Sequence, residues 1–329
     1  MKVMAPVSSY QTCVQQIKAG ANEIYVGMED DTFNKISFSG RGKHNNQGRK
    51  INPSYEELCN IVKYAHTYHV EVNFTANTIL GVGKNGMAPL FYNYVKAAIT
   101  TGIDRIIIGD LGNIIFLREK GIEMPMVGSV FLSAMNVETI NFYKKYGVNR
   151  IVLPHHMTIE EIEEIRKSTD MELEIFAGVG CSNIDGRCGF LHNSGECLDL
   201  GIPCKAQFRM NGNKIGTPLD STRDCLICSL IKLYRIGVDV LKIIGRDQDI
   251  NFTAAMTNIH SEMIKRIKED PEIAETKLKK SICKIPWWEN EFCKNQRCKY
   301  KNTKLEKAMF NRGNSNEKQT IKSLIQRGW

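Results

Sequence analysis

Short apolar segments alternate with amphipathic segments of helix length through most of this 329-residue chain. The apolar segments have the length of strands, and the stretches between most of them can hold a helix that crosses over to the next parallel strand. Eight such repeats are the number that closes a (β/α)8 barrel. The expected strands are Lys2–Ala5, Glu23–Val26, Glu71–Phe74, Arg105–Ile108, Met126–Gly128, Arg150–Leu153, Glu172–Phe176 and Val240–Ile244.

Signals for helix starts agree with this pattern. Ser54 and Glu57 have the spacing of a capping box before an apolar-periodic run, and Thr158 and Glu161 repeat it. A doubly wound sheet is the alternative fold, but no G-x-G-x-x-G motif follows the first expected strand. We therefore expect an α/β fold with a (β/α)8 barrel over residues 1–265. In such a barrel, functional side chains gather at the carboxyl ends of the strands.

The expected cellular compartment bears on how the cysteines are interpreted. The chain begins MKVMAPVSSY, without the apolar run of a signal peptide, and no stretch approaches the ~18 apolar residues of a membrane helix. We therefore expect a cytoplasmic protein without membrane insertion. In that compartment, most of the 11 cysteines are expected to bind metal rather than to form disulfides. Cys13 and Cys59 are the expected exceptions, as packing residues on apolar helix faces.

The main cysteine group follows the seventh expected strand, in an insertion of about 60 residues (about 177–230) before the eighth. A long insertion at this end of a barrel is usually functional. Four thiolates can hold an iron–sulfur cluster. Alternatively, the C-x-x-C pair Cys225 and Cys228 can form a tetrahedral zinc site with Cys197 and Cys204. The cysteines of the insertion are Cys181, Cys188, Cys197, Cys204, Cys225 and Cys228.

The expected C-terminal extension (266–329) is basic and rich in cysteine. From Lys277 to the C-terminus, 14 Lys and Arg stand against 4 Glu, a balance of +10, so the rest of the chain carries −2 of the total +8. Such a tail can bind RNA phosphates, and a solvated tail is the alternative. A second metal site, for zinc or a further cluster, is predicted at Cys228, Cys283, Cys293 and Cys298; a hydrophobic appendage with incidental thiols is the alternative.

Three polar residues follow expected strands and are candidates for substrate binding. Asn77 follows the third strand, His155 the sixth and Arg246 the eighth. A histidine there can bind an acidic group or move a proton, and an arginine can pair with a carboxylate or phosphate. Structural roles are the alternative for all three.

The chain resembles the peptidase U32 family over roughly residues 1–260. The resemblance rests on "MAPVSSYQTCVQQIKAGANEIYVGM", on "EIFAGVGCSNIDGRCGF" and on "VLKIIGR". It implies a barrel with a [4Fe-4S] cluster and oxygen-independent hydroxylation, which in family members acts on ubiquinone precursors, tRNA uridine or ribosomal RNA. Some members act in pairs, so a second U32-like chain or another protein is an implied partner. The implied cluster ligands are Cys181, Cys188, Cys204 and Cys225.

We therefore expect an iron–sulfur protein that catalyses or supports hydroxylation of an RNA base, quinone precursor, peptide or other small aromatic substrate. A non-catalytic iron–sulfur subunit that presents substrate to another enzyme is the first alternative. True proteolysis is the second, with His155 or His156 as base to Cys181. That role requires a free thiol, which a cluster ligand does not have.

Overall fold

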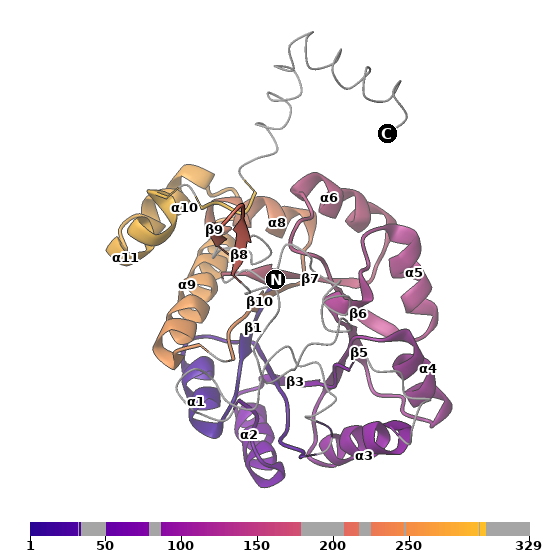
Figure 1. Ribbon diagram of the computed structural model, residues 1–329. Coiled ribbons are helices and arrows are strands. Elements are labelled where there is room, and N and C mark those ends of the chain that lie inside the picture. Colours follow the sequence, from indigo (N-terminus) through magenta and orange to yellow (C-terminus); the bar gives the residue numbers. More distant parts are fainter. Residues whose placement is uncertain are drawn as a thin grey trace, which may run out of the picture.

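Eight parallel strands close into a barrel surrounded by helices, as expected from the sequence (Figure 1). The computed structural model describes residues 1–31, 33, 51–78, 87–178, 207–216, 225–246, 248–295 and 297–300. Neighbouring strands follow the order β1-β10-β7-β6-β5-β4-β3-β2. The barrel strands are β1 (Lys2–Pro6), β2 (Glu23–Val26), β3 (Glu71–Thr75), β4 (Arg105–Ile108), β5 (Met126–Gly128), β6 (Val148–Val152), β7 (Glu172–Ala177) and β10 (Val240–Ile243).

Helices connect successive strands on the outside of the barrel. They are α1 (Tyr10–Lys18), α2 (Tyr55–Thr67), α3 (Met87–Thr100), α4 (Leu111–Glu119), α5 (Val137–Lys145), α6 (Ile159–Ser168), α8 (Leu230–Ile236) and α9 (Ile250–Glu269). A two-stranded hairpin, β8 (Phe208–Met210) and β9 (Asn213–Gly216), lies in the sequence interval between β7 and β10. The extension adds α10 (Glu275–Ile282), the short α11 (Pro286–Trp288) and a π-helical turn, η6 (Glu289–Cys293).

Helix caps follow the sequence signals with one exception. Thr158 and Glu161 form the expected reciprocal capping box of α6. At α2 only half of the predicted box forms, because the Glu57 carboxylate accepts a hydrogen bond from the Tyr10 backbone N–H at 2.7 Å. That bond ties the start of α1 to the start of α2.

Apolar side chains fill two regions. One lies between the strands and the surrounding helices, and the other lies inside the barrel. Cys13 is fully buried, as expected for a packing residue. Cys59 is less buried than expected, because part of its side chain remains exposed. The interior group consists of Met4, Tyr25, Ile107, Val127, Val130, Val152, Phe176, Val240 and Ile244.

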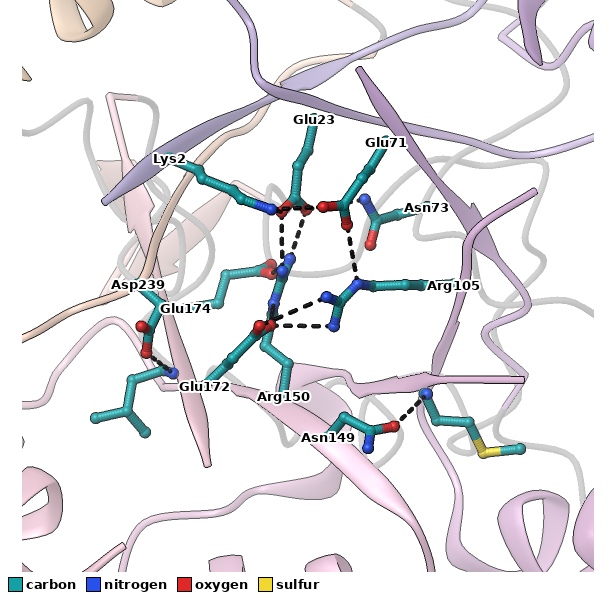
Figure 2. Close-up of polar contacts among 12 residues, drawn as sticks. Lys2, Glu23, Glu71, Asn73, Arg105, Asn149, Arg150, Glu172, Glu174 and Asp239 are labelled. Carbon is teal, nitrogen blue, oxygen red and sulfur yellow. Dashed lines mark hydrogen bonds and ion pairs between the residues drawn. The ribbon is translucent and has the colours of Figure 1, made fainter. Parts of the chain in front are cut away.

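The amino-terminal half of the barrel interior is charged instead (Figure 2). Arg150 is fully buried and donates to both oxygens of Glu23, at 2.6 and 2.9 Å, and to Glu172 at 2.7 Å. Four cationic and four anionic side chains balance within this charged layer, which is why it can be buried. Its members are Lys2, Glu23, Glu71, Arg105, Arg150, Glu172, Glu174 and Lys242.

The pKa values of this layer follow from the pairing. Burial by itself would raise the pKa of Glu23, but the hydrogen bonds and charges of Arg150 and Lys2 lower it to about 2. The pKa of Lys2 is raised, because Glu71 and Glu23 outweigh the effect of burial. The pairing therefore favours the charged forms of Glu23 and Lys2, and the layer fills the amino end of the barrel.

The last described residues of the extension return to the barrel. Cys298 forms a parallel β-bridge with Cys225, with backbone hydrogen bonds from Cys225 to Arg297 and from Lys299 to Cys225, both 2.9 Å. The Lys299 ammonium then donates to the Phe176 carbonyl oxygen in β7, at 2.8 Å. Among the described helices, none has the length and apolar character needed to cross a membrane.

Candidate functional site at the carboxyl ends of the strands

The three predicted substrate-binding residues lie where the barrel predicts them, just past the carboxyl ends of three strands. Asn77 follows β3, His155 follows β6 and Arg246 follows β10. Asn77 and Arg246 are only 8% and 7% exposed, and His155 is partly buried. Buried polar groups at this end of a barrel are where substrates of such folds bind.

Arg246 is held by an amide and an aromatic ring. Its Nη1 donates to Asn52 Oδ1 at 3.3 Å, and its guanidinium lies 5.6 Å from the centroid of the Tyr25 ring. Gly27 lies beneath this pair: a Cβ at residue 27 would come within 2.4 Å of Asn52 Oδ1 and 3.1 Å of Arg246 Nη1. A side chain at residue 27 would therefore clash with Asn52, and its absence lets the Arg246 guanidinium lie against the end of β2.

Tyr25 also carries a second cation. Lys242 Nζ lies 4.7 Å from its ring centroid and donates to Glu174 Oε1 at 3.0 Å. A cation over a ring face is stabilised by the ring quadrupole. Tyr25 thus links the charged layer below it to Arg246 above it.

Asn77 presents a polar atom to which none of the described residues donates a hydrogen bond. Its Nδ2 donates to Ser129 Oγ at 3.2 Å, but its Oδ1 is buried and accepts no hydrogen bond in the described part of the chain. Gly109, after β4, is tightly placed against this oxygen, since a Cβ there would lie 3.1 Å away. A buried acceptor without a partner costs free energy, so it is a candidate contact for a ligand.

His155 is fixed as a neutral ring. It stacks on Phe176 with ring centroids 4.6 Å apart and planes inclined by 10°. Burial lowers its pKa well below 6.5, and the nearby positive charges of Lys299 and His156 lower it further. Lys299 therefore brings the C-terminal segment to the same side of the mouth as His155.

Of the four predicted cluster ligands, the structure describes one. Cys181, Cys188 and Cys204 lie outside the described residues, as does Cys197. Cys225 is 6% exposed, and its sulfur accepts a hydrogen bond from the Ile227 backbone N–H at 3.4 Å. Burial raises the pKa of this thiol to about 12. A buried sulfur with an N–H donor is the environment that cluster ligands require.

The remaining described thiols of the C-terminal half belong to neighbouring segments. Cys283 caps α10 and Cys293 ends η6, and their sulfurs are 3.8 Å apart. Cys298 lies in the bridge with Cys225, and Cys228 lies in η5 (Ile227–Ser229). In the part of the chain that the structure describes, no three or more His, Cys, Asp or Glu side chains are already arranged to hold a metal ion. The second metal site therefore stays a prediction.

Several residues of the mouth were not foreseen from the sequence. Asn52 is distant from every expected strand, and Lys299 belongs to the extension, so neither had a local signal. Tyr25 had a local signal, because alternate residues of a strand share a face. Tyr25 lies in β2, and its side chain belongs to the interior apolar group. The charged layer also had a local signal, because Glu23 and Arg105 open strands that are otherwise apolar.

The model of peptidase family U32 matches residues 8–305, which includes the barrel after β1 and most of the extension. The chain belongs to the peptidase U32 family. A solved structure of a U32 peptidase covers 74% of this chain and 93% of its own, at 15% identity and a TM-score of 0.49. The U32 match extends past the part of the sequence in which the resemblance was seen.

U32 relatives carry names from two fields of chemistry. The tRNA hydroxylation protein P of Escherichia coli is 30% identical over 190 residues, 54% of this chain and 40% of the relative. The 23S rRNA 5-hydroxycytidine C2501 synthase of Escherichia coli is 24% identical, covering 82% of this chain and 40% of the relative. The Collagenase of Porphyromonas gingivalis is 25% identical, covering 80% and 65%. This chain thus spans 40% to 65% of the length of these relatives.

Proposed function

We propose that this U32 chain hydroxylates an RNA base, or supports that reaction as one member of a pair, with a [4Fe-4S] cluster as its cofactor. The observation that carries this most is kinship to proteins named for tRNA hydroxylation and for 5-hydroxycytidine synthesis in 23S rRNA. Peptides, quinone precursors and other small aromatic compounds are the competing substrates.

The mouth of the barrel supplies groups that suit a nucleotide. Arg246 and Lys299 provide positive charge for a phosphate, and Asn77 Oδ1 provides a buried acceptor for a base N–H. His155, held neutral, can form a hydrogen bond without adding a charge. A base must leave its stack to reach such a site, so single-stranded or looped RNA is the expected form.

The cluster would be held by Cys181, Cys188, Cys204 and Cys225. Cys225 fits this role, because it is buried and its sulfur accepts the Ile227 N–H. A bound cluster supplies single-electron transfer at a potential tuned by burial and by such N–H donors. Hydroxylation replaces C–H by C–OH, so a second substrate must deliver the oxygen atom, and Arg246 is a candidate to bind it if it is anionic.

Nucleoside mass spectrometry of RNA tests this function. A strain that lacks the gene should lose one hydroxylated nucleoside, and the wild-type gene should restore it. Cys225→Ala and Arg246→Met should not restore it, whereas Cys13→Ser should, because Cys13 is a fully buried packing residue within α1. An unchanged nucleoside profile in the deletion strain would argue against RNA as the substrate.

Iron content tests the cofactor separately. Anaerobically purified protein should hold about four irons per chain, and Cys225→Ala should lose them. Cys228→Ala should lose less iron than Cys225→Ala. Retention of all iron in Cys225→Ala would show that the fourth ligand has been assigned to the wrong residue.

Two other outcomes distinguish the alternatives. If the purified chain binds RNA but modifies it only with a second protein present, the chain is the supporting subunit. If it cleaves a peptide and Cys225→Ala cleaves equally well, the peptidase reading holds, which the relative named Collagenase keeps open.

A further inference from the structure

The C-terminal extension brings two thiols into contact. Cys283 is the C-cap of α10, and Cys293 is the last residue of η6, ten residues later. Their sulfurs are 3.8 Å apart, well beyond the roughly 2.05 Å of a disulfide. Two ligands on one tetrahedral zinc ion, each at about 2.3 Å from the metal, lie about 3.8 Å apart. The observed pair therefore already has the spacing of one edge of a zinc–thiolate tetrahedron.

Two further thiols come from segments that are tied to each other. The β-bridge between Cys225 and Cys298 fixes the end of the extension beside the chain that leads into η5. Cys228 lies in η5, three residues after that bridge. Two thiols from α10 and η6, one from η5 and one from the returning segment thus approach from four elements.

The segments that carry these thiols are in contact. Helix α10, which Cys283 caps, lies against η5, which contains Cys228. Cys298 is held beside Cys225, three residues before Cys228. Four thiols on adjoining segments are a donor set that suits a structural zinc ion.

We propose that Cys228, Cys283, Cys293 and Cys298 form a closed tetrahedral thiolate site for one zinc ion, separate from the predicted iron–sulfur cluster. Zinc fits better than a second cluster, because thiolates on different irons of a cubane lie further apart than two ligands of one ion. Among the described residues these four side chains do not yet enclose a metal ion, so binding requires a change of side-chain conformation at the site.

A closed site of four thiolates leaves no position for substrate, so its role is structural. It would join η5, which directly follows Cys225, to three parts of the extension. The ion would therefore hold the segment that carries Lys299 against the end of β7. This role does not depend on whether the substrate is RNA.

Metal analysis of the full chain tests the site. Protein purified without oxygen should contain about one zinc per chain in addition to its iron. Cys283→Ser and Cys293→Ser should each lose the zinc and keep the iron. Cys59→Ser is the matched control, because it removes a partly buried thiol from α2, and it should keep both metals.

Wild-type protein provides a second measurement in case the variants fold poorly. Cobalt in place of zinc should give the visible absorption of a tetrahedral thiolate complex, with unchanged circular dichroism. Three results would overturn the site: absence of zinc from the wild type, a disulfide between Cys283 and Cys293 under the same conditions, or loss of iron together with zinc in both variants. The last result would mean that all these thiols serve a single centre.

Discussion

Arg150 shows how much of the barrel depends on a single side chain. Its guanidinium reaches Glu23, Glu172 and Glu174, and it is the largest buried cation of the charged layer. The planar fork allows several carboxylates to be paired at once, which an ammonium group cannot do with the same geometry. Burial lowers the pKa of an arginine, but here the three carboxylates raise it. The residue therefore stays protonated in its buried position.

Replacing Arg150 by Met should lower the free energy of unfolding by about 3–5 kcal/mol, because Glu23 and Glu174 would remain buried without their main cation. Urea denaturation at neutral pH measures this loss. Lys167→Met is the control, since Lys167 pairs with Glu163 and Glu164 on an exposed helix face and should change little. A loss for Arg150→Met as small as the control would mean that water enters and solvates the two carboxylates.

At the scale of elements, α9 connects the barrel to the extension. His260 in α9 is fully buried, its Nδ1 lies 2.7 Å from the Met256 carbonyl oxygen, and its ring packs edge-on against Trp288 of α11. Its Nε2 is buried without a partner among the described residues. Burial lowers the pKa of His260 to about 4, so the folded protein holds this ring neutral.

This contact predicts an acid-sensitive joint. The unfolded histidine titrates near 6.5. Between about pH 6.5 and 4 the unfolded chain therefore binds more protons than the folded protein, so the free energy of unfolding decreases as the pH is lowered. Between pH 7.5 and 5.0 the wild type should lose about 2 kcal/mol more than His260→Phe, which keeps the packing but cannot titrate. Urea denaturation at both pH values gives the comparison. Equal losses in the two proteins would assign the effect to other groups, such as His155.

The elements of the barrel were predictable because their signals are local. The bounds of β2, β4 and β5 agree with the sequence expectation, and the other strands differ by one residue at the carboxyl end. Strand β6 also begins two residues earlier than expected. The capping box at Thr158 was predicted correctly, whereas Glu57 bonds to Tyr10, a residue 47 positions away, which no local pattern reveals. Local strand and helix signals thus predict the elements of the barrel, whereas tertiary contacts decide which cap hydrogen bonds form.

The site was predictable only in part for the same reason. Asn77, His155 and Arg246 were found because each directly follows a strand, and barrel topology brings strand ends together. Asn52 and Lys299 reach the same mouth through contacts 194 and 123 residues apart in sequence. Such long-range pairings leave no periodicity or spacing by which a single sequence could reveal them.

At the scale of the whole molecule, charge is divided between two regions. The chain before Lys277 carries −2 and the rest carries +10. The charged layer inside the barrel balances itself, so it adds nothing to the outer field. Attraction of a polyanion must therefore come mainly from the extension, whose Lys299 already contacts the end of β7.

Deleting residues 301–329 should weaken RNA binding. The deleted segment holds seven Lys and Arg against two Glu. Because fewer phosphates would be neutralised, the slope of log affinity against log salt should become shallower by up to about 4. Filter binding over a range of salt concentrations measures both changes. Iron and zinc contents should stay unchanged, and identical salt slopes for the two proteins would show that the tail does not contact RNA.

The charged layer also has a kinetic consequence. Because the charged layer and the apolar group fill the described barrel interior, a ligand at the mouth must enter and leave from the carboxyl side. If the proposed hydroxylation takes place at this mouth, a product that still fills the entrance prevents the next substrate from binding, so the two should compete for the same form of the protein. Added product should therefore act as a competitive inhibitor, and under saturating substrate its departure can set the turnover rate.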